Sequence, residues 1–152
     1  MRIALVVSQY HAFITDRLEA GARAALAEAG VPETHVETFA VPGAFELPQA
    51  AARVAARGDW DAVVCLGCLI RGETPHFDYI AAAAAHGITA AGQQTGVPVS
   101  FGVLTTNTAD EALARAGDGA QNKGREAALA ALDMARLYAR IGLGRPAGRG
   151  PR

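Results

Sequence analysis

The sequence predicts an α/β protein in which helices cover both faces of a four-stranded parallel sheet, a three-layer α/β/α sandwich. Four short apolar runs indicate strands, and they lie at residues 2–7, 35–41, 61–70 and 97–105. A segment with helical spacing follows each run, so strand and helix alternate along the chain. The run "DAVVCLGCLI" (61–70) is continuously apolar, which is typical of a parallel strand covered on both faces. The 152 residues suit one compact domain.

The first two helices are predicted from spacing and from residues that interrupt helices. The first covers residues 13–29, where Gly30 is placed to end it. Its apolar face consists of Ile14, Leu18, Ala22 and Leu26. Pro42-Gly43 ends the second strand, and a helix is predicted from about Phe45 to Arg57, with Pro48 tolerated in its first turn.

The remaining helices have their own boundary signals. A third helix follows the 71–76 loop and is predicted to end near Gly87 or Gly92. A short helix covers residues 108–117, with Thr108 as its cap and Gly117 as its stop. A long helix covers residues 122–142, and the stripe along it consists of Ala128, Leu132, Ala135 and Ala139. The tail 142–152 is rich in Gly, Pro and Arg and is predicted to be disordered, which leaves residues 1–141 as the domain.

Composition excludes several classes of protein. The net charge of −1 provides no basic field for nucleic acid or for a membrane surface. No run of 18 strongly apolar residues and no signal peptide is visible, so the expectation is a soluble cytoplasmic protein. Two cysteines do not make a disulfide framework. Many of the apolar residues are alanines, which bury little area each, and this favours oligomerisation.

The cysteines and most of the histidines are predicted to be structural. Cys65 and Cys68 lie three apart inside a predicted strand, so their side chains should point to opposite faces and cannot share a metal or a disulfide. His35 is expected on a strand near its start, and His86 near a helix C-terminus. The position of His11, at a strand end, is compatible with either a structural or a functional role. The histidines form no H-x-x-x-H pair, so no metal site is expected.

Four suggestive segments follow the four strands, at the sheet edge where α/β proteins bind ligands. They are "SQYHAF", "PGAFELP", "RGETPHF" and "TTNT". The third contains His76, at the junction of strand and helix, with Arg71, Glu73 and Asp78 nearby. A histidine there can transfer protons near neutral pH, or it can be a polar residue that fills the turn. Position alone leaves both readings open.

A glycine-containing turn, "RAGDGAQNKG" (115–124), precedes the last helix. Free backbone N–H groups, the helix dipole and the cations Arg115 and Lys123 can together bind an anion. The alternative is a loop whose charges are simply solvated. The spacing does not match a Walker loop, and no G-x-G-x-x-G follows the first strand, which argues against a dinucleotide-binding fold.

Taken together, four segments resemble the lumazine synthase family of riboflavin biosynthesis. They are "VPGAFELP" (41–48), "IRGETPHFDY" (70–79), "VPVSFGVLTT" (97–106) and "RAGDGAQNKGREAA" (115–128). The likeness spans roughly residues 2–140. It implies a flavodoxin-like sandwich, a homopentamer with active sites between neighbouring subunits, and no metal or organic cofactor. It also implies two small-molecule substrates, 5-amino-6-(D-ribitylamino)uracil and L-3,4-dihydroxy-2-butanone 4-phosphate, which form 6,7-dimethyl-8-ribityllumazine.

The resemblance also implies roles for individual residues. His76 matches the proton-transfer histidine. The positions that match the pyrimidine and ribityl site are Tyr10, Ala44, Phe45, Glu46, Cys68, Leu69, Ile70 and Phe101. The positions that match the phosphate side are Glu73, Thr74, Arg115 and Lys123. Phe101 and Arg115 would come from the neighbouring subunit.

Some positions depart from the family pattern. The chain begins at the first core strand, without the N-terminal segment that many members exchange with a neighbour, so a pentamer is expected rather than an icosahedral shell. Tyr10 stands where phenylalanine or tryptophan is commoner, and Gly119 and Gln121 replace the usual lysine and glycine. Two alternatives to an enzyme are a flavin- or lumazine-binding protein without turnover and a flavodoxin-like FMN carrier. The second is disfavoured because "SQYHAFIT" lacks a hydroxyl-rich phosphate loop.

Overall fold

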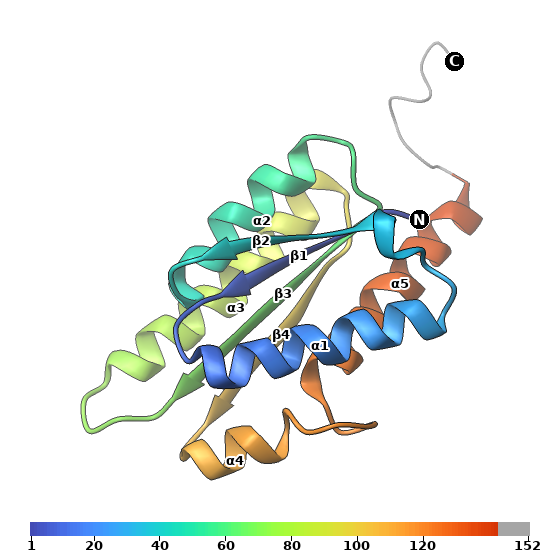
Figure 1. Ribbon diagram of the computed structural model, residues 1–152. Helices are drawn as coiled ribbons and strands as arrows, with labels where there is room; N and C mark the ends of the chain where they lie inside the picture. Colours follow the sequence, from blue (N-terminus) through green and yellow to red (C-terminus); the bar gives the residue numbers. More distant parts are fainter. Residues whose placement is uncertain (143–152) are drawn as a thin grey trace.

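The computed structural model describes residues 1–142, and its centre is a four-stranded sheet in which all neighbouring strands are parallel (Figure 1). The strands are β1 (Ile3–Ser8), β2 (Val36–Val41), β3 (Ala62–Ile70) and β4 (Val99–Thr106), in the spatial order β2-β1-β3-β4. This order is the flavodoxin-like one, in which the chain reverses direction across the sheet between β1 and β3. The predicted fold class is confirmed. The tail predicted to be disordered lies, beyond Gly142, outside the described residues.

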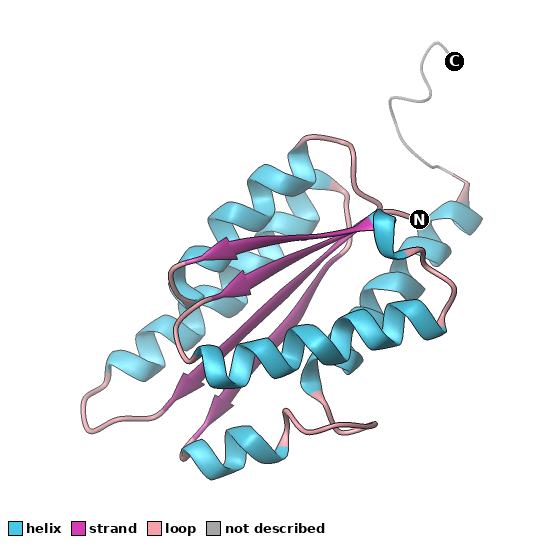
Figure 2. Cartoon of the chain, in the orientation of Figure 1, coloured by secondary structure: helices cyan, strands magenta, loops and turns pink. Residues whose placement is uncertain are grey.

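Within residues 1–142, five helices cover the two faces of this sheet (Figure 2). They are α1 (Ala12–Glu28), α2 (Leu47–Ala56), α3 (His76–Thr95), α4 (Ala109–Ala114) and α5 (Lys123–Ile141). Helices α1, α4 and α5 pack on one face, and α2 and α3 pack on the other. Short 3₁₀ turns at 33–35 and 44–46 precede β2 and α2. None of the helices within residues 1–142 is both long and apolar enough to cross a membrane.

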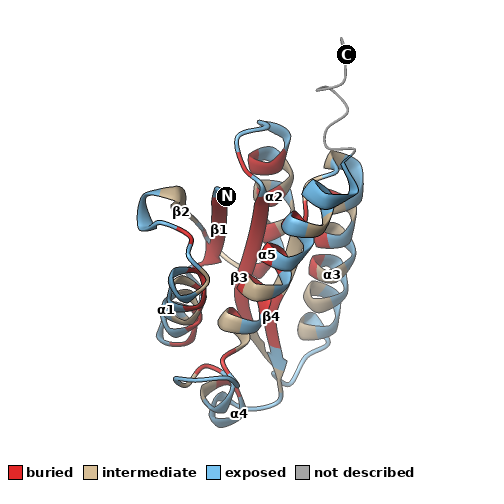
Figure 3. Cartoon of the chain, turned by 90° about the vertical axis from the view of Figure 1, so that its right-hand side faces the viewer, coloured by how far each residue is buried: buried red, intermediate tan, exposed pale blue. Residues whose placement is uncertain are grey.

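The two central strands supply both halves of the core (Figure 3). Every residue of β1 is buried, and its side chains alternate between the faces: Leu5 packs under α1 and α5, whereas Val6 packs under α2. The continuously apolar β3 behaves in the same way. The edge strand β2 is only partly buried. Burial on both faces explains why β1 has no polar residue before Ser8 and why β3 has no charged or hydroxyl residue at all.

Helix α3 is longer than predicted, because it runs through Gly87 and Gly92 and ends at Thr95. Gly96, with φ of 74°, is the left-handed residue that terminates it. A Cβ on Gly87 would lie 2.6 Å from Cβ of Pro48, so this glycine allows α2 and α3 to approach closely and does not act as a stop. The prediction for His86 is therefore wrong: it lies in the middle of α3, exposed, and not at a helix C-terminus.

Other boundaries differ by a few residues, and each difference has a local cause. Thr108 caps α4 as predicted, because its hydroxyl accepts a hydrogen bond from the Glu111 N–H at 3.1 Å, but the helix ends at Ala114, before Gly117. His35 lies in the 3₁₀ turn before β2, not on the strand. Residues 44–46 form a 3₁₀ turn, so α2 begins two residues later than predicted. The stripe on α5 ends at Ala135, since Ala139 is exposed.

Candidate functional site

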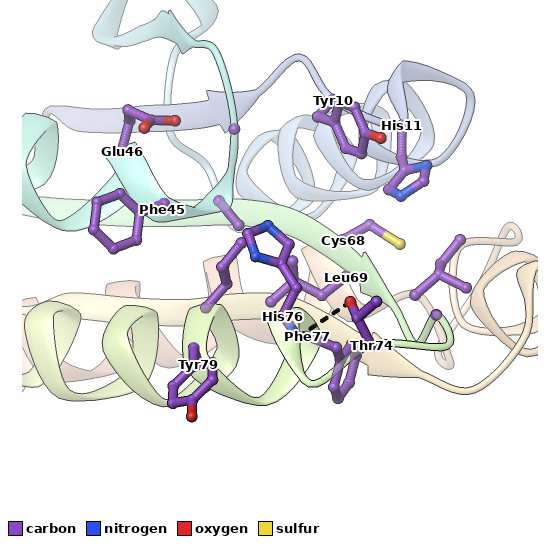
Figure 4. Close-up of a pocket in the computed structure, with 15 residues that line it drawn as sticks. Tyr10, His11, Phe45, Glu46, Cys68, Leu69, Thr74, His76, Phe77 and Tyr79 are labelled. Atoms are coloured by element: carbon purple, nitrogen blue, oxygen red, sulfur yellow. Dashed lines mark hydrogen bonds between the residues drawn. The ribbon is translucent and has the colours of Figure 1, made fainter.

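A pocket of about 900 Å³ opens at the carboxyl ends of β1, β2 and β3, beside the first turns of α3 (Figure 4). Four segments meet there, and each follows or ends a strand. They are the turn after β1, the 43–46 turn, the end of β3, and the loop and first turns of α3. The position matches the rule that parallel sheets bind ligands at the point where the strand order reverses.

Nine of the residues that sequence reasoning singled out line this pocket. They are Tyr10, Ala44, Phe45, Glu46, Cys68, Leu69, Ile70, Thr74 and His76. They come from segments up to 66 positions apart in the chain, since 76 minus 10 is 66. The parallel sheet brings them together because all its carboxyl ends lie at one edge.

His76 is the first residue of α3 and is exposed. Pro75 precedes it, and the His76 N–H donates a hydrogen bond of 3.4 Å to the Thr74 hydroxyl, which shapes the turn into the helix. Figure 4 shows its imidazole pointing into the space between the turn that carries Phe45 and the turn that carries Tyr10. The ring is therefore available to a bound molecule.

Arg71 holds the loop that leads to His76. Its N–H donates to the Thr106 carbonyl at 2.8 Å, and its Nε donates to Asn107 Oδ1 at 3.1 Å. Its guanidinium also lies 3.3 Å from an Asp78 carboxylate oxygen and 4.5 Å from the centre of the Phe77 ring. These contacts connect the loop to the end of β4 and to the first turn of α3. These contacts therefore fix the turn that carries the His76 imidazole.

The turn after β1 presents Tyr10 and His11 to the pocket. The Tyr10 N–H donates to the Pro42 carbonyl at 3.1 Å, which connects this turn to the end of β2. His11 adopts φ of 62°, the left-handed region that is uncommon outside glycine, and its ring centroid lies 4.6 Å from that of Tyr10 in an edge arrangement. Burial lowers the pKa of His11, which favours the neutral imidazole.

The rim of the pocket is aromatic and open to solvent. Tyr10 is 67% exposed, Phe45 54% and Tyr79 73%. Large apolar side chains cost free energy when they face water, so such a rim favours a bound ring or a neighbouring protein surface. Glu46, which is half-buried, supplies a carboxylate beside these rings.

Cys65 and Cys68 point to opposite faces of the sheet, as predicted. Cys65 packs in the cluster under α2 and α3, and Cys68 in the cluster under α1 and α5. Both thiols are free. Burial raises the pKa of Cys65 to about 12 and that of Cys68 to about 11.

We therefore expect the folded protein to resist thiol alkylation at pH 8. A thiol with a pKa of about 11 is ionised to about one part in a thousand at that pH, and only the thiolate is nucleophilic. Iodoacetamide labelling followed by mass spectrometry should find neither cysteine modified in the native protein and both modified in urea. Rapid labelling of native Cys68 would contradict this account of its environment.

Four predicted residues lie outside the pocket. Phe101, on β4, packs half-buried against the core under α2 and α3. Glu73 is exposed on the 71–75 loop. Arg115 and Lys123 flank the α4–α5 connection, which packs on α1, on the face of the sheet opposite α2 and α3. Within one chain, these two cations do not meet His76.

The structure adds pocket residues that sequence reasoning did not assign. They are His11, Gly43, Gly72, Phe77, Tyr79 and Ile80. The three from α3 lie within the four positions after His76, and a helix that begins at the pocket necessarily contributes its first turns as well. The position of these residues shortly after His76 would have identified them as pocket residues from the sequence alone. The strand-end position of His11 left its role open, because its inward orientation depends on a left-handed backbone.

The chemistry of the pocket suits a flat polar molecule. Aromatic rings can stack on it, backbone groups at the end of β3 can hydrogen-bond its edge, and two imidazoles and a carboxylate can move or accept protons. No group of three potential metal ligands occurs within the described part of the chain. Fold and pocket together define a protein of the flavodoxin-like α/β class with a site for a small molecule.

Comparison with known proteins identifies the family. The 6,7-dimethyl-8-ribityllumazine synthase family matches residues 1–139. The chain is also 52% identical over 137 residues to the 6,7-dimethyl-8-ribityllumazine synthase of Chlorobium phaeovibrioides (strain DSM 265 / 1930), covering 90% of this chain and 88% of that protein. The chain belongs to the 6,7-dimethyl-8-ribityllumazine synthase family, transferases of riboflavin biosynthesis.

Proposed function

We propose that the protein condenses 5-amino-6-(D-ribitylamino)uracil with L-3,4-dihydroxy-2-butanone 4-phosphate. The products are 6,7-dimethyl-8-ribityllumazine, one phosphate and two waters. The observation that carries this proposal is the exposed imidazole of His76 in an aromatic pocket of a chain from this family. Each step of the reaction moves protons near neutral pH, which an imidazole can do.

The pyrimidine substrate is assigned to the pocket already described. Tyr10 stacks on its ring, an arrangement worth about 0.5–1.5 kcal/mol beyond the area buried. Backbone groups of Cys68, Leu69 and Ile70 bind the edge of the ring. The ribityl chain lies along the 44–46 turn, where the Glu46 carboxylate accepts hydrogen bonds from its hydroxyls. The exposed Tyr10 and Phe45 rings leave room for both parts of this molecule.

The reaction begins when the primary amine of the pyrimidine attacks the ketone. His76 relays the protons as the carbinolamine loses water and becomes an imine. Phosphate is then eliminated, and the ribitylamino nitrogen attacks the remaining carbonyl. Loss of a second water closes the ring. Holding the two reactants together supplies most of the acceleration, because effective molarity is a larger contribution than general acid–base catalysis.

The phosphate end of the site is proposed to lie between subunits of a homopentamer. Glu73 and Thr74 border the pocket of one subunit, and Phe101, Arg115 and Lys123 come from its neighbour. The guanidinium binds the departing phosphate with a planar set of donors. Two observations support this arrangement: Arg115 does not line the pocket that contains His76 in its own chain, and the pocket rim leaves aromatic rings exposed.

The decisive experiment mixes the purified protein with both substrates and follows lumazine absorbance and phosphate release together. Equal amounts of lumazine and phosphate are expected. Phosphate without lumazine, or neither product, would reject the enzyme and favour a protein that binds flavin or lumazine without turnover. An FMN carrier would instead be isolated with FMN bound.

Assembly is tested separately by sedimentation velocity, where a species five times the 15.7 kDa chain is expected. A monomer at the concentration used in the assay would contradict a site shared between subunits. We place the reaction in the cytoplasm, where reducing conditions keep thiols such as Cys65 and Cys68 free.

A further inference from the structure

The connection between α4 and α5 is a preformed loop. Residues 115–122 leave the end of α4 at Arg115 and return to the start of α5. The Lys123 N–H donates to the Arg115 carbonyl at 2.8 Å, and the Asn122 N–H donates to the Gly119 carbonyl at 3.2 Å. The main chain of Arg115 is therefore held directly beside that of Lys123.

The side chain of Asn122 occupies the inside of this loop and is only 3% exposed. Its Nδ2 donates to the carbonyls of Ala116 at 3.2 Å, Gly117 at 3.0 Å and Arg17 at 3.1 Å. Its Oδ1 accepts from the Arg125 N–H at 3.0 Å and so caps α5. One buried amide thus connects the loop, α5 and α1.

Two glycines make room for this amide between α1 and α5. A Cβ on Gly21 of α1 would overlap the Asn122 side chain, and a Cβ on Gly124 would overlap the Leu18 carbonyl oxygen. The two glycines let α1 and α5 approach until the Arg17 carbonyl comes within reach of Nδ2. This hydrogen bond fixes the loop against α1, between two residues that are 105 positions apart in the sequence.

Arg115 itself is exposed, and its guanidinium forms no ion pair with any residue in the 1–142 range. No hydrogen bond or ion pair of the Arg115 side chain within the described residues therefore fixes where its charge lies. Its placement depends on its main chain, and two of the three Nδ2 hydrogen bonds hold the two residues that directly follow it.

We propose that Asn122 is a positioning residue that orients Arg115 toward the phosphate of the four-carbon substrate. The inference rests on the proposed function. The inference goes beyond the proposed function, because it assigns the geometry of the phosphate site to a buried amide that does not contact the substrate. Loss of the Nδ2 donors should misplace Arg115 while leaving the pyrimidine pocket, which contains none of residues 115–123, unaltered.

The test is the variant Asn122→Ser, which keeps a hydroxyl acceptor for the Arg125 N–H but removes all three Nδ2 bonds. KM for the butanone phosphate should rise about tenfold, as expected when a charge-assisted phosphate contact is weakened. KM for the pyrimidine should stay within about twofold. Arg115→Ala should show the same selectivity. Val54→Ala, on α2 and far from the loop, controls for a general loss of stability.

A second variant covers the case in which Asn122→Ser fails to fold. Gly119→Ala strains the exposed part of the loop, where φ is 100° and nothing lies within 4 Å of an added Cβ, and it leaves the buried amide intact. Gly119→Ala should also raise KM for the butanone phosphate and leave KM for the pyrimidine nearly unchanged. An equal rise in both KM values, or no rise in either variant, would overturn the inference.

Inorganic phosphate separates failure of this inference from failure of the proposed function. Phosphate should raise the thermal midpoint of the wild-type protein, and this shift should be lost in Arg115→Ala and Asn122→Ser. A wild-type protein that binds phosphate but makes no lumazine would reject the proposed function alone. A shift absent from the wild type, or kept in full by Asn122→Ser, would reject the positioning role.

Discussion

Replacement of His76 by alanine is expected to slow lumazine formation by about 10²–10⁴-fold without abolishing it. The range is that of general acid–base catalysis, and the remaining rate comes from the two substrates being held together in the pocket. Because the His76 imidazole is exposed and only its main-chain N–H hydrogen-bonds within the loop, the fold should be unchanged. Steady-state kinetics with both substrates at saturation measures the effect.

His86→Ala is the matched control, because it removes an exposed histidine from the same helix outside the pocket. It should leave kcat unchanged. Complete inactivity of His76→Ala in a folded and assembled protein would show that proximity contributes less than we propose. Full activity would remove His76 from the reaction.

Replacement of Gly124 by alanine is expected to destabilise the protein by about 3 kcal/mol, at the upper end of the range for overpacked cores. The added Cβ would overlap the Leu18 carbonyl oxygen, which belongs to the backbone of α1 and cannot rotate away. Alanine is the better helix former by about 1 kcal/mol, but this gain is smaller than the cost of separating α1 from α5. Urea unfolding at a fixed protein concentration measures the loss.

Gly72→Ala provides the comparison for this measurement, since nothing lies within 4 Å of its added Cβ and its φ is not in the left-handed region. It should change the free energy of unfolding by less than about 1 kcal/mol. A Gly124→Ala protein as stable as the wild type would mean that the α1–α5 approach is looser than described. The Asn122 hydrogen bond to Arg17 would then lose its structural basis.

The prediction of the fold succeeded where the signal was local. Leu5 and Val6 belong to an apolar run that could be recognised without any partner, and the spacing of Ile14, Leu18 and Leu26 marks the buried face of α1. It failed where the role of a residue depends on its contact with a segment distant in the chain. Gly87 looks like a helix stop in sequence, yet it is the contact point with Pro48 on another helix.

The predictions for the candidate site also succeeded for some residues and failed for others. The carboxyl ends of parallel strands meet at one edge, so the motifs containing Tyr10, Glu46 and His76 could be expected in one pocket once the strand pattern was known. The place of Arg115 could not be deduced in this manner. Its loop follows the last strand and folds back over α1, on the other face of the sheet.

The amino-acid sequence alone determined the alternation of strands and helices, the buried faces and the set of motifs at the ligand-binding edge. These follow from backbone periodicity, which acts over a few residues. Only the tertiary structure decided where α3 ends, that His11 turns into the pocket, and how Asn122 connects the 115–122 loop to α1. The physical reason is that the approach of Gly87 to Pro48 and the bond from Asn122 to Arg17 join segments distant in the chain, and such contacts exist only after the core has packed. The inward turn of His11 depends on its left-handed backbone.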